Sequence, residues 1–233
     1  MTDRRVAMIT GASGGLGRVL VPDLAADGWG LVVVGSSQER LDTLVADAGL
    51  VADRTATVVA DLRDASAAVS AVDAAYERFG RVDALAHLVG GWTGGMHVGR
   101  SPDDPYRDMI DQHFWTSLNV VRELAPRMID AGFGRIAAVS SPMAAAPDAG
   151  MSAYGVGKAA QETLFAALAQ EVAGTGVTVN VVRVRAIDTD AGAAGSDKPD
   201  ATTPAQISAA LRYLFSDAAR VVNGERLGLH SGL

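Results

Sequence analysis

Tyr154 and Lys158 stand four residues apart in the stretch SAYGVGKAAQ, residues 152 to 161. On a helix, side chains at positions i and i+4 share one face, so a phenol and an ammonium would lie side by side. A nearby positive charge favours the phenolate and would lower the pKa of the tyrosine. The pair could then donate and accept a proton near neutral pH. The same spacing also occurs on ordinary amphipathic helices, so the rest of the chain has to decide between the two interpretations.

Four glycines, Gly11, Gly14, Gly15 and Gly17, follow the apolar run VAMIT at residues 6–10. Glycine permits positive φ angles and lets the backbone approach a ligand closely. The helical pattern that begins here would also offer unpaired N–H groups and a partial positive charge to a pyrophosphate. A strand, a glycine-rich turn and a helix start in this order are typical of a dinucleotide-binding loop.

Short apolar runs rich in β-branched residues alternate along the chain with longer alanine-rich stretches. The expected strands are 6–10, 31–35, 55–60, 82–90, 135–140, 177–184 and 225–230, and the expected helices are 15–28, 38–48, 65–80, 104–131, 152–173 and 204–216. Continuous apolar strands favour a parallel sheet that is buried on both faces. The alternation predicts an α/β fold, a Rossmann-like doubly wound parallel sheet of about seven strands flanked by helices on both faces. Because no linker or change of composition interrupts it, we expect a single domain over residues 1–233.

The overall composition narrows the class of partner. The net charge of −7 and the isoelectric point near 5.0 argue against a nucleic acid or an anionic membrane. The chain has no cysteine, which excludes thiolate chemistry and zinc–thiolate sites, and we expect no metal site. Neither a signal peptide nor an apolar run of membrane-spanning length is visible, so a cytoplasmic protein acting on a small molecule is expected.

Two segments rich in small and polar residues, 90–105 and 191–203, each follow an expected strand at its carboxyl end. Open α/β sheets bind their ligands at that edge. We interpret the two segments as walls and a lid of a site, and two plain surface loops are the alternative.

The stretch TGASGGLG at residues 10–17, together with Tyr154 and Lys158, resembles the short-chain dehydrogenase/reductase family, and the resemblance covers nearly the whole chain. Ser141 lies 13 residues before Tyr154, as the family's catalytic serine does, whereas the adjacent Ser140 does not fit that spacing. The resemblance implies an oxidoreductase in which Ser141 holds the substrate carbonyl oxygen and Tyr154 donates the proton. Lys158 would lower the tyrosine pKa and bind the nicotinamide ribose.

The resemblance also implies a site for a nicotinamide dinucleotide, with Asp61 at the adenine and Thr189 at the nicotinamide. The expected cofactor-binding residues are Gly11, Ser13, Gly14, Gly15, Leu16, Gly17, Ser36, Ser37, Arg40, Asp61, Leu62, Val89, Gly90, Tyr154, Lys158, Ile187 and Thr189.

Family members that use NAD usually carry an aspartate where this chain has Gly35. The missing acid removes repulsion against a 2′-phosphate. Ser36 and Ser37 can donate hydrogen bonds to such a phosphate, and Arg40 lies one helical turn further on. The sequence therefore favours NADP(H), and NAD(H) stays possible because neither set of determinants is complete.

Three departures from the family pattern concern the site itself. His87-Leu88-Val89-Gly90 replaces the usual Asn-Asn-Ala-Gly, which would change either a loop–strand hydrogen bond or a contact with the cofactor ribose. His113 falls where an asparagine usually organises a proton-relay water, and a histidine can bind water and titrate near neutral pH. A histidine that only fills the helix is the alternative. Val184-Arg185 replaces a Pro-Gly pair, so Arg185 either faces solvent or meets an anionic substrate.

These replacements support a second hypothesis, a nucleotide-binding protein with little or no redox activity. The intact set Ser141, Tyr154 and Lys158 opposes it, because a non-catalytic protein has no need of those three side chains. The first hypothesis is therefore preferred: an NADP(H)-dependent enzyme that reduces a carbonyl or oxidises the matching alcohol.

The substrate is not fixed by the sequence. Trp92, Met96, His97 and Met143 are expected to line the pocket, which suggests an apolar or cyclic ketone, and a 3-oxoacyl thioester is the alternative. The segment 190–203 is short for the family and suggests an open site.

Apolar and small side chains on two of the expected helices predict self-association. They are Phe114, Trp115 and Leu118 on the helix 104–131, and Val156, Ala160 and Ala167 on the helix 152–173. An exposed apolar patch needs cover, so we expect a homotetramer, with a dimer as the second possibility.

Overall fold

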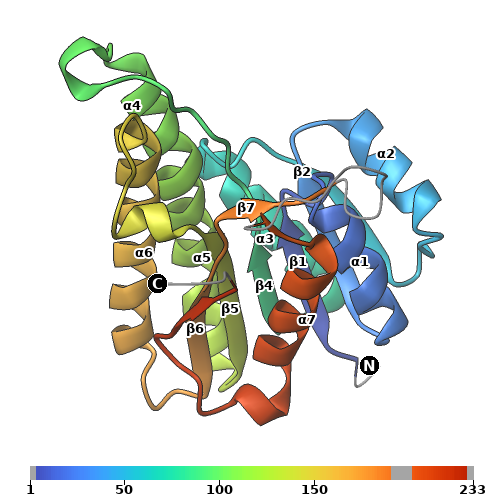
Figure 1. The fold of residues 1–233 in the computed structure, drawn as a ribbon. Coiled ribbons are helices and arrows are strands. Elements are labelled where there is room, and N and C mark those ends of the chain that lie inside the picture. Colours follow the sequence, from blue (N-terminus) through green and yellow to red (C-terminus); the bar gives the residue numbers. More distant parts are fainter. Residues whose placement is uncertain (1–3, 190–200, 230–233) are drawn as a thin grey trace.

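A seven-stranded parallel sheet forms the centre of the protein, in a computed structural model that describes residues 4–189 and 201–229 (Figure 1). The strand order is β3-β2-β1-β4-β5-β6-β9. The strands are β1 (Val6–Thr10), β2 (Gly30–Gly35), β3 (Thr55–Val59), β4 (Ala84–His87), β5 (Gly134–Ser140), β6 (Val177–Arg183) and β9 (Arg226–Gly228). A separate pair joins β7 (Ala186–Ile187) to β8 (Ala201–Thr202).

Helices cover both faces of this sheet (Figure 1). One apolar cluster lies under α1 (Gly17–Ala26), α2 (Gln38–Asp47) and α7 (Pro204–Phe215). The other lies under α3 (Ala65–Phe79), α5 (Thr116–Asp130) and α6 (Ser152–Glu171). The described residues also contain three short 3-10 turns: η1 (Val98–Arg100), η3 (Pro142–Ala144) and η4 (Asp217–Ala219).

The strands are apolar throughout because both of their faces are buried. In β1, Met8 points into one cluster while Ala7 and Ile9 point into the other, as the two-residue period of a strand requires. The predicted α/β class with a doubly wound parallel sheet is therefore confirmed. The strand expected at 82–90 is shorter than predicted, since pairing stops at His87 and the chain leaves the sheet there.

The helix expected over residues 104–131 is interrupted. It consists of α4 (Asp104–Ile110), a π-helical turn η2 (Asp111–Trp115) and α5. Two hydroxyls stabilise the interruption: Thr116 Oγ1 donates to the Gln112 carbonyl at 2.7 Å, and Ser117 Oγ donates to the His113 carbonyl at 2.6 Å. Such π turns are frequent at functional sites, and this one carries His113.

Helix α6 is fastened to the sheet by one buried carboxylate. The side chain of Glu162 is 5% exposed and pairs with Arg183 of β6 and Arg226 of β9. Arg183 Nε lies 2.8 Å from Oε1, and Arg226 Nε lies 3.0 Å from Oε2. Burial raises the pKa of Glu162, but hydrogen bonds from Arg183 and the other partners leave that pKa below its ordinary value. The carboxylate therefore fixes the helix that carries Tyr154 and Lys158.

Several of the apolar positions expected on the surface are exposed. Trp115 is 42% exposed and Val156 is 45% exposed, and Ala167 is also exposed, whereas Phe114, Leu118 and Ala160 are half-buried. Self-association of these helices stays a prediction. No helix within the described ranges is long and apolar enough to cross a membrane.

Replacing Glu162 by glutamine should lower the free energy of unfolding at pH 7 by about 2–3 kcal/mol, because two arginines lose their charged partner. The pKa of Glu162 is depressed in the folded protein, so its contribution is complete above the ordinary carboxyl pKa and is lost as the pH falls through the depressed value. Urea unfolding of the wild type and of Glu162→Gln between pH 3 and pH 7 measures this contribution to the free energy of unfolding. The two curves should converge at the acid end. Glu171→Gln, an exposed carboxylate at the end of the same helix, is the control. A stability difference that does not change with pH would contradict the ion-pair explanation.

Candidate active site

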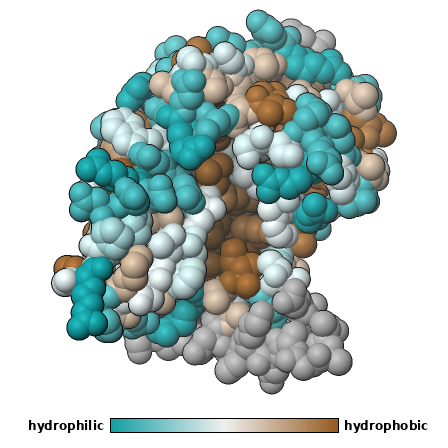
Figure 2. All heavy atoms as spheres, turned by 90° about the horizontal axis from the view of Figure 1, so that it is seen from above, coloured by the Kyte–Doolittle hydropathy of each residue, from teal (hydrophilic) through white to brown (hydrophobic). Residues whose placement is uncertain are grey.

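A cleft runs along the carboxyl edge of the sheet. It contains two adjoining cavities of about 330 Å³ and 540 Å³. They share part of their lining, namely Gly11, Gly14, Leu88, Val89 and Gly90. In Figure 2 an apolar hollow lies between polar rims on this side of the molecule. The cleft thus lies beyond the carboxyl ends of the neighbouring strands β1 and β4, where the strand order reverses. A doubly wound sheet is expected to bind its ligands there.

The glycine loop forms the floor shared by the two cavities. Gly11 has a φ of +70°, and a Cβ on Gly17 would lie 2.0 Å from the Ala12 carbonyl oxygen, so neither position accepts a larger residue without strain. A Cβ on Gly15 would lie 2.6 Å from Cγ2 of Thr189, which places the Thr189 side chain directly against the loop. No side chain caps α1, and its Arg18 and Val19 N–H groups donate to the carbonyls of Gly14 and Leu16 at 3.0 Å and 3.1 Å. The partial positive charge of this helix end favours an anion beside it.

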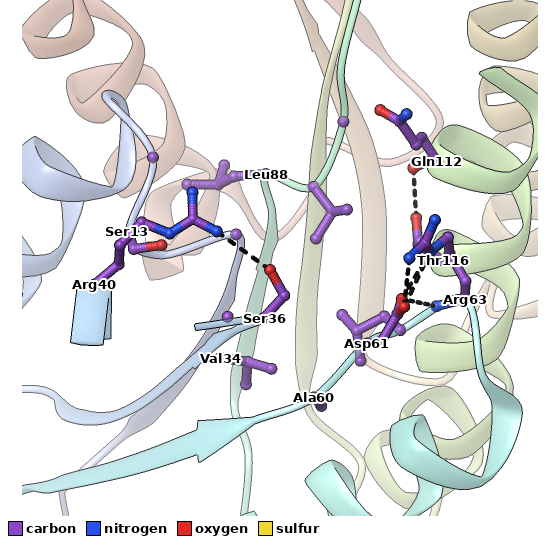
Figure 3. A pocket seen from close by; sticks show the side chains of 16 residues that line it. Ser13, Val34, Ser36, Arg40, Ala60, Asp61, Arg63, Leu88, Gln112 and Thr116 are labelled. Carbon is purple, nitrogen blue, oxygen red and sulfur yellow. Dashed lines mark hydrogen bonds and ion pairs between the residues drawn. The ribbon is translucent and has the colours of Figure 1, made fainter. Parts of the chain in front are cut away.

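Ser36 and Arg40 lie beside the smaller cavity at the end of β2, together with Ser13 (Figure 3). Arg40 Nη2 donates to Ser36 Oγ at 3.3 Å. Ser37, which we also expected in the site, does not line the cavity. Its hydroxyl oxygen accepts the Arg40 backbone N–H at 3.4 Å and caps α2, which holds the side chain at the helix start.

Asp61 and Leu62 follow β3 and line the same cavity, and Arg63 holds the Asp61 carboxylate in a bidentate pair (Figure 3). Arg63 Nε lies 2.9 Å from Oδ1, and Nη2 lies 2.6 Å from Oδ2. Hydrogen bonds from the Arg63 side chain lower the pKa of Asp61 although burial opposes them. Arg63, which no sequence motif pointed to, brings a guanidinium to this end of the cleft.

Ser141 and Tyr154 are brought together at the other end. Ser141 follows β5, is 1% exposed and accepts the Met143 N–H at 3.3 Å. Tyr154 lies in the first turn of α6 and lines the larger cavity, next to Ser140. Burial raises the pKa of Tyr154, and a hydrogen bond with Ser141 opposes that rise. The lowering expected from the spacing is therefore not found, because burial outweighs the stabilisation of the phenolate.

Lys158 is buried in the wall of the larger cavity, which Tyr154 also lines, and two acceptors hold its ammonium group. Its Nζ donates to the Val139 carbonyl at 2.8 Å and to Gln161 Oε1 at 3.1 Å. Burial lowers the pKa of Lys158 to about 7, and the charge of Glu162 counters this effect. The i, i+4 spacing placed Lys158 on the correct face, but its long side chain reaches acceptors on β5 and one turn along α6.

His113 lies against Tyr154, with the ring centroids 5.6 Å apart in an edge arrangement. Since a carbonyl can only accept, His113 Nε2–H donates to Gly91 O at 3.0 Å. Nδ1 is then an acceptor, and it is buried without a partner among the described residues. Burial and the charge of Lys158 lower the pKa of His113 to about 3. The expectation that it titrates near neutral pH is wrong, because the ring is desolvated and lies near a cation.

His87 takes no part in the cavity lining. It is fully buried between Thr10 Oγ1, 2.9 Å from Nδ1, and Thr116 Oγ1, 3.3 Å from Nε2. The Thr116 hydroxyl donates its only proton to Gln112, so it accepts from Nε2–H, and Nδ1 accepts from Thr10. Burial lowers the pKa of His87 to about 3. The replaced asparagine position therefore changes a hydrogen bond between strand and helix.

The remaining expected residues divide between the cleft and its surroundings. Leu16, Ile187, Arg185 and Trp92 line the larger cavity. Arg185 is exposed there, so the interpretation as a residue facing only solvent is too simple. Met96, His97 and Met143 do not line either described cavity. Met143 lies buried beside α6, and His97 is exposed on the loop beyond the sheet edge. The short segment 190–200 lies outside the described residues.

Comparison with known proteins agrees with this geometry. The sequence pattern of the short chain dehydrogenase family matches residues 5–200. The 3-oxoacyl-[acyl-carrier-protein] reductase FabG of Salmonella typhimurium is 28% identical over 240 residues, which cover 98% of this chain and 97% of that protein. Acetoacetyl-CoA reductase of an Acinetobacter species is 29% identical over 246 residues, which cover 100% and 99%.

A solved short-chain type dehydrogenase/reductase from Mycobacterium ulcerans has the same fold, with a TM-score of 0.89, 24% identity and coverage of 98% of this chain and 90% of that chain. The family pattern covers most of the sequence, Tyr154 and Lys158 line the cleft with the glycine-rich loop, and Ser141 forms a hydrogen bond with Tyr154. The protein is therefore a member of the short-chain dehydrogenase/reductase family and an oxidoreductase enzyme.

Proposed function

We propose that this enzyme reduces the ketone of a 3-oxoacyl thioester with NADPH as the hydride donor. The main observation is that Tyr154, with Ser141 hydrogen-bonded to it, lies at one end of a cleft whose floor is the glycine loop. The uncapped N-terminus of α1 and the tight packing at Gly17 fit a dinucleotide pyrophosphate. NADPH would supply the hydride, and the protein supplies orientation and the proton.

Tyr154 is the proposed proton donor. Because burial raises its pKa, the phenol carries its proton at neutral pH, which is the form that carbonyl reduction needs. Ser141 lies within hydrogen-bonding reach and would hold the substrate oxygen beside the phenol. An ammonium group has three N–H donors, and Lys158 uses two of them on Val139 and Gln161. The third is available to the ribose hydroxyls of the cofactor.

His113 is proposed to complete the route by which a proton reaches Tyr154. Its Nδ1 is a buried acceptor with no partner among the described residues, and it lies beside the phenol and Gly90. A water bound to this nitrogen would have a fixed acceptor. With a pKa of about 3 the ring stays neutral, so it would orient water without taking up the proton itself.

The preference for NADP(H) is supported by Ser36 and Arg40 at the end of β2. No acidic side chain lies at Gly35, and the Arg40 guanidinium reaches Ser36 Oγ. A 2′-phosphate here would meet one cation, one hydroxyl and the N-terminus of α2.

The thioester substrate is supported by the two relatives, which are named as reductases of a 3-oxoacyl carrier protein and of acetoacetyl-CoA. The cleft has an apolar hollow (Figure 2) and the exposed cation Arg185 on its larger cavity, which suits an acyl chain with an anionic carrier. Both features would also accept a ketone with an acidic group.

A nucleotide-binding protein with little redox activity is the second candidate. It is favoured by the hydrogen bonds that Lys158 makes within the described residues, which go to Val139 and Gln161 and not to Tyr154. Binding of NADPH without turnover of acetoacetyl-CoA and of simple ketones would support it.

The cofactor proposal is tested by fluorescence titration with NADPH and with NADH. We expect tighter binding of NADPH, and Arg40→Ala should weaken that binding by roughly tenfold while leaving NADH nearly unchanged, because a charge-assisted hydrogen bond to the 2′-phosphate is lost. Arg54→Ala, which removes an exposed arginine outside the cleft, should change neither constant. Tighter binding of NADH by the wild type would reject the NADP(H) preference.

Tyr154→Phe should lower kcat for the reduction of acetoacetyl-CoA by roughly 10²- to 10⁴-fold, since the proton donor is removed. Its affinity for NADPH should stay within about twofold, because the ring and its packing remain. Tyr213→Phe on the exposed face of α7 is the matched control and should leave kcat unchanged. Full activity of Tyr154→Phe would show that another group donates the proton.

His113→Asn should retain most of the activity, because a carboxamide can also accept a hydrogen bond from water. His113→Leu should lower kcat by about tenfold or more, because no acceptor remains. The pKa of His113 is about 3, so this residue should contribute no ionisation near pH 6.5 to the pH profile of kcat. The wild type and His113→Asn should therefore have the same profile in that range. Equal activity of the leucine variant and the wild type would contradict the proposed relay.

A further inference from the structure

A chain of buried hydrogen bonds leads from Lys158 away from the cleft. Lys158 Nζ donates to Gln161 Oε1 at 3.1 Å, and Gln161 Nε2 donates to Ser117 Oγ at 3.0 Å. Ser117 Oγ in turn donates to the His113 carbonyl at 2.6 Å. Gln161 and Ser117 are both 0% exposed. These hydrogen bonds join helix α6 to the π turn η2, and the proposed mechanism assigns no role to Gln161 or Ser117.

The donor and acceptor of each hydrogen bond follow from the final bond of the chain, between Ser117 and the His113 carbonyl. The His113 carbonyl can only accept, so the Ser117 hydroxyl must give it its single proton. Ser117 Oγ can then only accept from Gln161, which turns the amide nitrogen of Gln161 toward Ser117 and its oxygen toward Lys158. The network therefore presents a fixed acceptor to the lysine.

Few groups around Lys158 can stabilise its ammonium charge, so the acceptor Gln161 Oε1 matters for that charge. The titratable groups near it are Tyr154 and Glu162 on α6, His87 at the end of β4 and His113 on the π turn. Both histidines are neutral at neutral pH, and Glu162 is already paired with two arginines. The Val139 carbonyl and Gln161 Oε1 are thus the hydrogen-bonding acceptors that Lys158 has among the described residues.

We propose that Gln161, oriented by Ser117, is a positioning residue that keeps the buried Lys158 protonated and in place. A hydrogen bond to the charged ammonium is stronger than one to the neutral amine, so this acceptor favours the charged form. The same bonds connect the position of Lys158 to the turn that carries His113. The catalytic consequence rests on the proposed function, but the protonation of Lys158 can be measured without any substrate.

The sequence makes the measurement direct. It contains two lysines, Lys158 and Lys198, beside 18 arginines. In the full-length Lys198→Arg protein, Lys158 is the single lysine, so NMR of protein labelled with lysine carrying ¹³C at the ε position gives one signal. Following its shift from pH 5 to pH 10 gives the pKa of Lys158, whose starting value should lie near 7.

In this background, Gln161→Met keeps the length of the side chain and removes the strong acceptor. It should lower the pKa of Lys158 by about one pH unit. Gln161→Glu should raise it, because a carboxylate favours the ammonium more strongly than an amide does. Ser117→Ala should also lower the pKa of Lys158, but by less than Gln161→Met does. This milder substitution provides the test if the methionine variant does not fold. Ser208→Ala removes an equally buried hydroxyl from α7 and should leave the pKa unchanged.

Opposite shifts for methionine and glutamate, with no shift for Ser208→Ala, would support the proposal, because a purely structural role would not produce opposite signs. An unchanged pKa in Gln161→Met and Ser117→Ala, or an equal shift in Ser208→Ala, would overturn it. If the shifts occur but no variant and no parent protein reduces acetoacetyl-CoA, the proposed function fails and this inference stands.

Discussion

The parallel direction of all seven strands is the constraint from which the site follows. Parallel strands end at the same edge, so the glycine loop after β1, Ser36 after β2, Asp61 after β3 and Ser141 after β5 meet there although they are far apart in the sequence. Helix α6 then completes the arrangement from one face of the sheet. Its position depends on Glu162, whose carboxylate is held by arginines from two neighbouring strands.

Burial sets the electrostatics of the cleft more than proximity does. Desolvation keeps the phenol of Tyr154 protonated, keeps both histidines neutral and brings the pKa of Lys158 to about 7. The groups that oppose this tendency are few and specific: Ser141 at the phenol, and Val139 and Gln161 at the ammonium. The site therefore starts with a protonated acid beside a lysine whose charge depends on its hydrogen bonds.

The residues that depart from the family pattern are compensated by their neighbours. His87 fits because Thr10 and Thr116 satisfy both of its ring nitrogens. His113 fits because the π turn places it against Tyr154 and gives Nε2 the Gly91 carbonyl, which leaves Nδ1 as a buried acceptor. The Thr116 hydroxyl thus belongs to the hydrogen bonds around His87, and the Ser117 hydroxyl to those around His113.

Local patterns in the sequence determined the strands, the helices, the glycine loop and the placement of Tyr154 and Lys158 on one helical face, since each depends on neighbours within a few residues. The tertiary structure decided what that face meets. The carbonyl of Val139 and the amide of Gln161 accept hydrogen bonds from the Lys158 ammonium, and burial lowers the pKa of that group. Likewise, Ser37 caps α2 and does not line the cavity, and Arg63 pairs with Asp61. Hydrogen-bond partners and desolvation arise from segments distant in sequence, so only the packed molecule defines them.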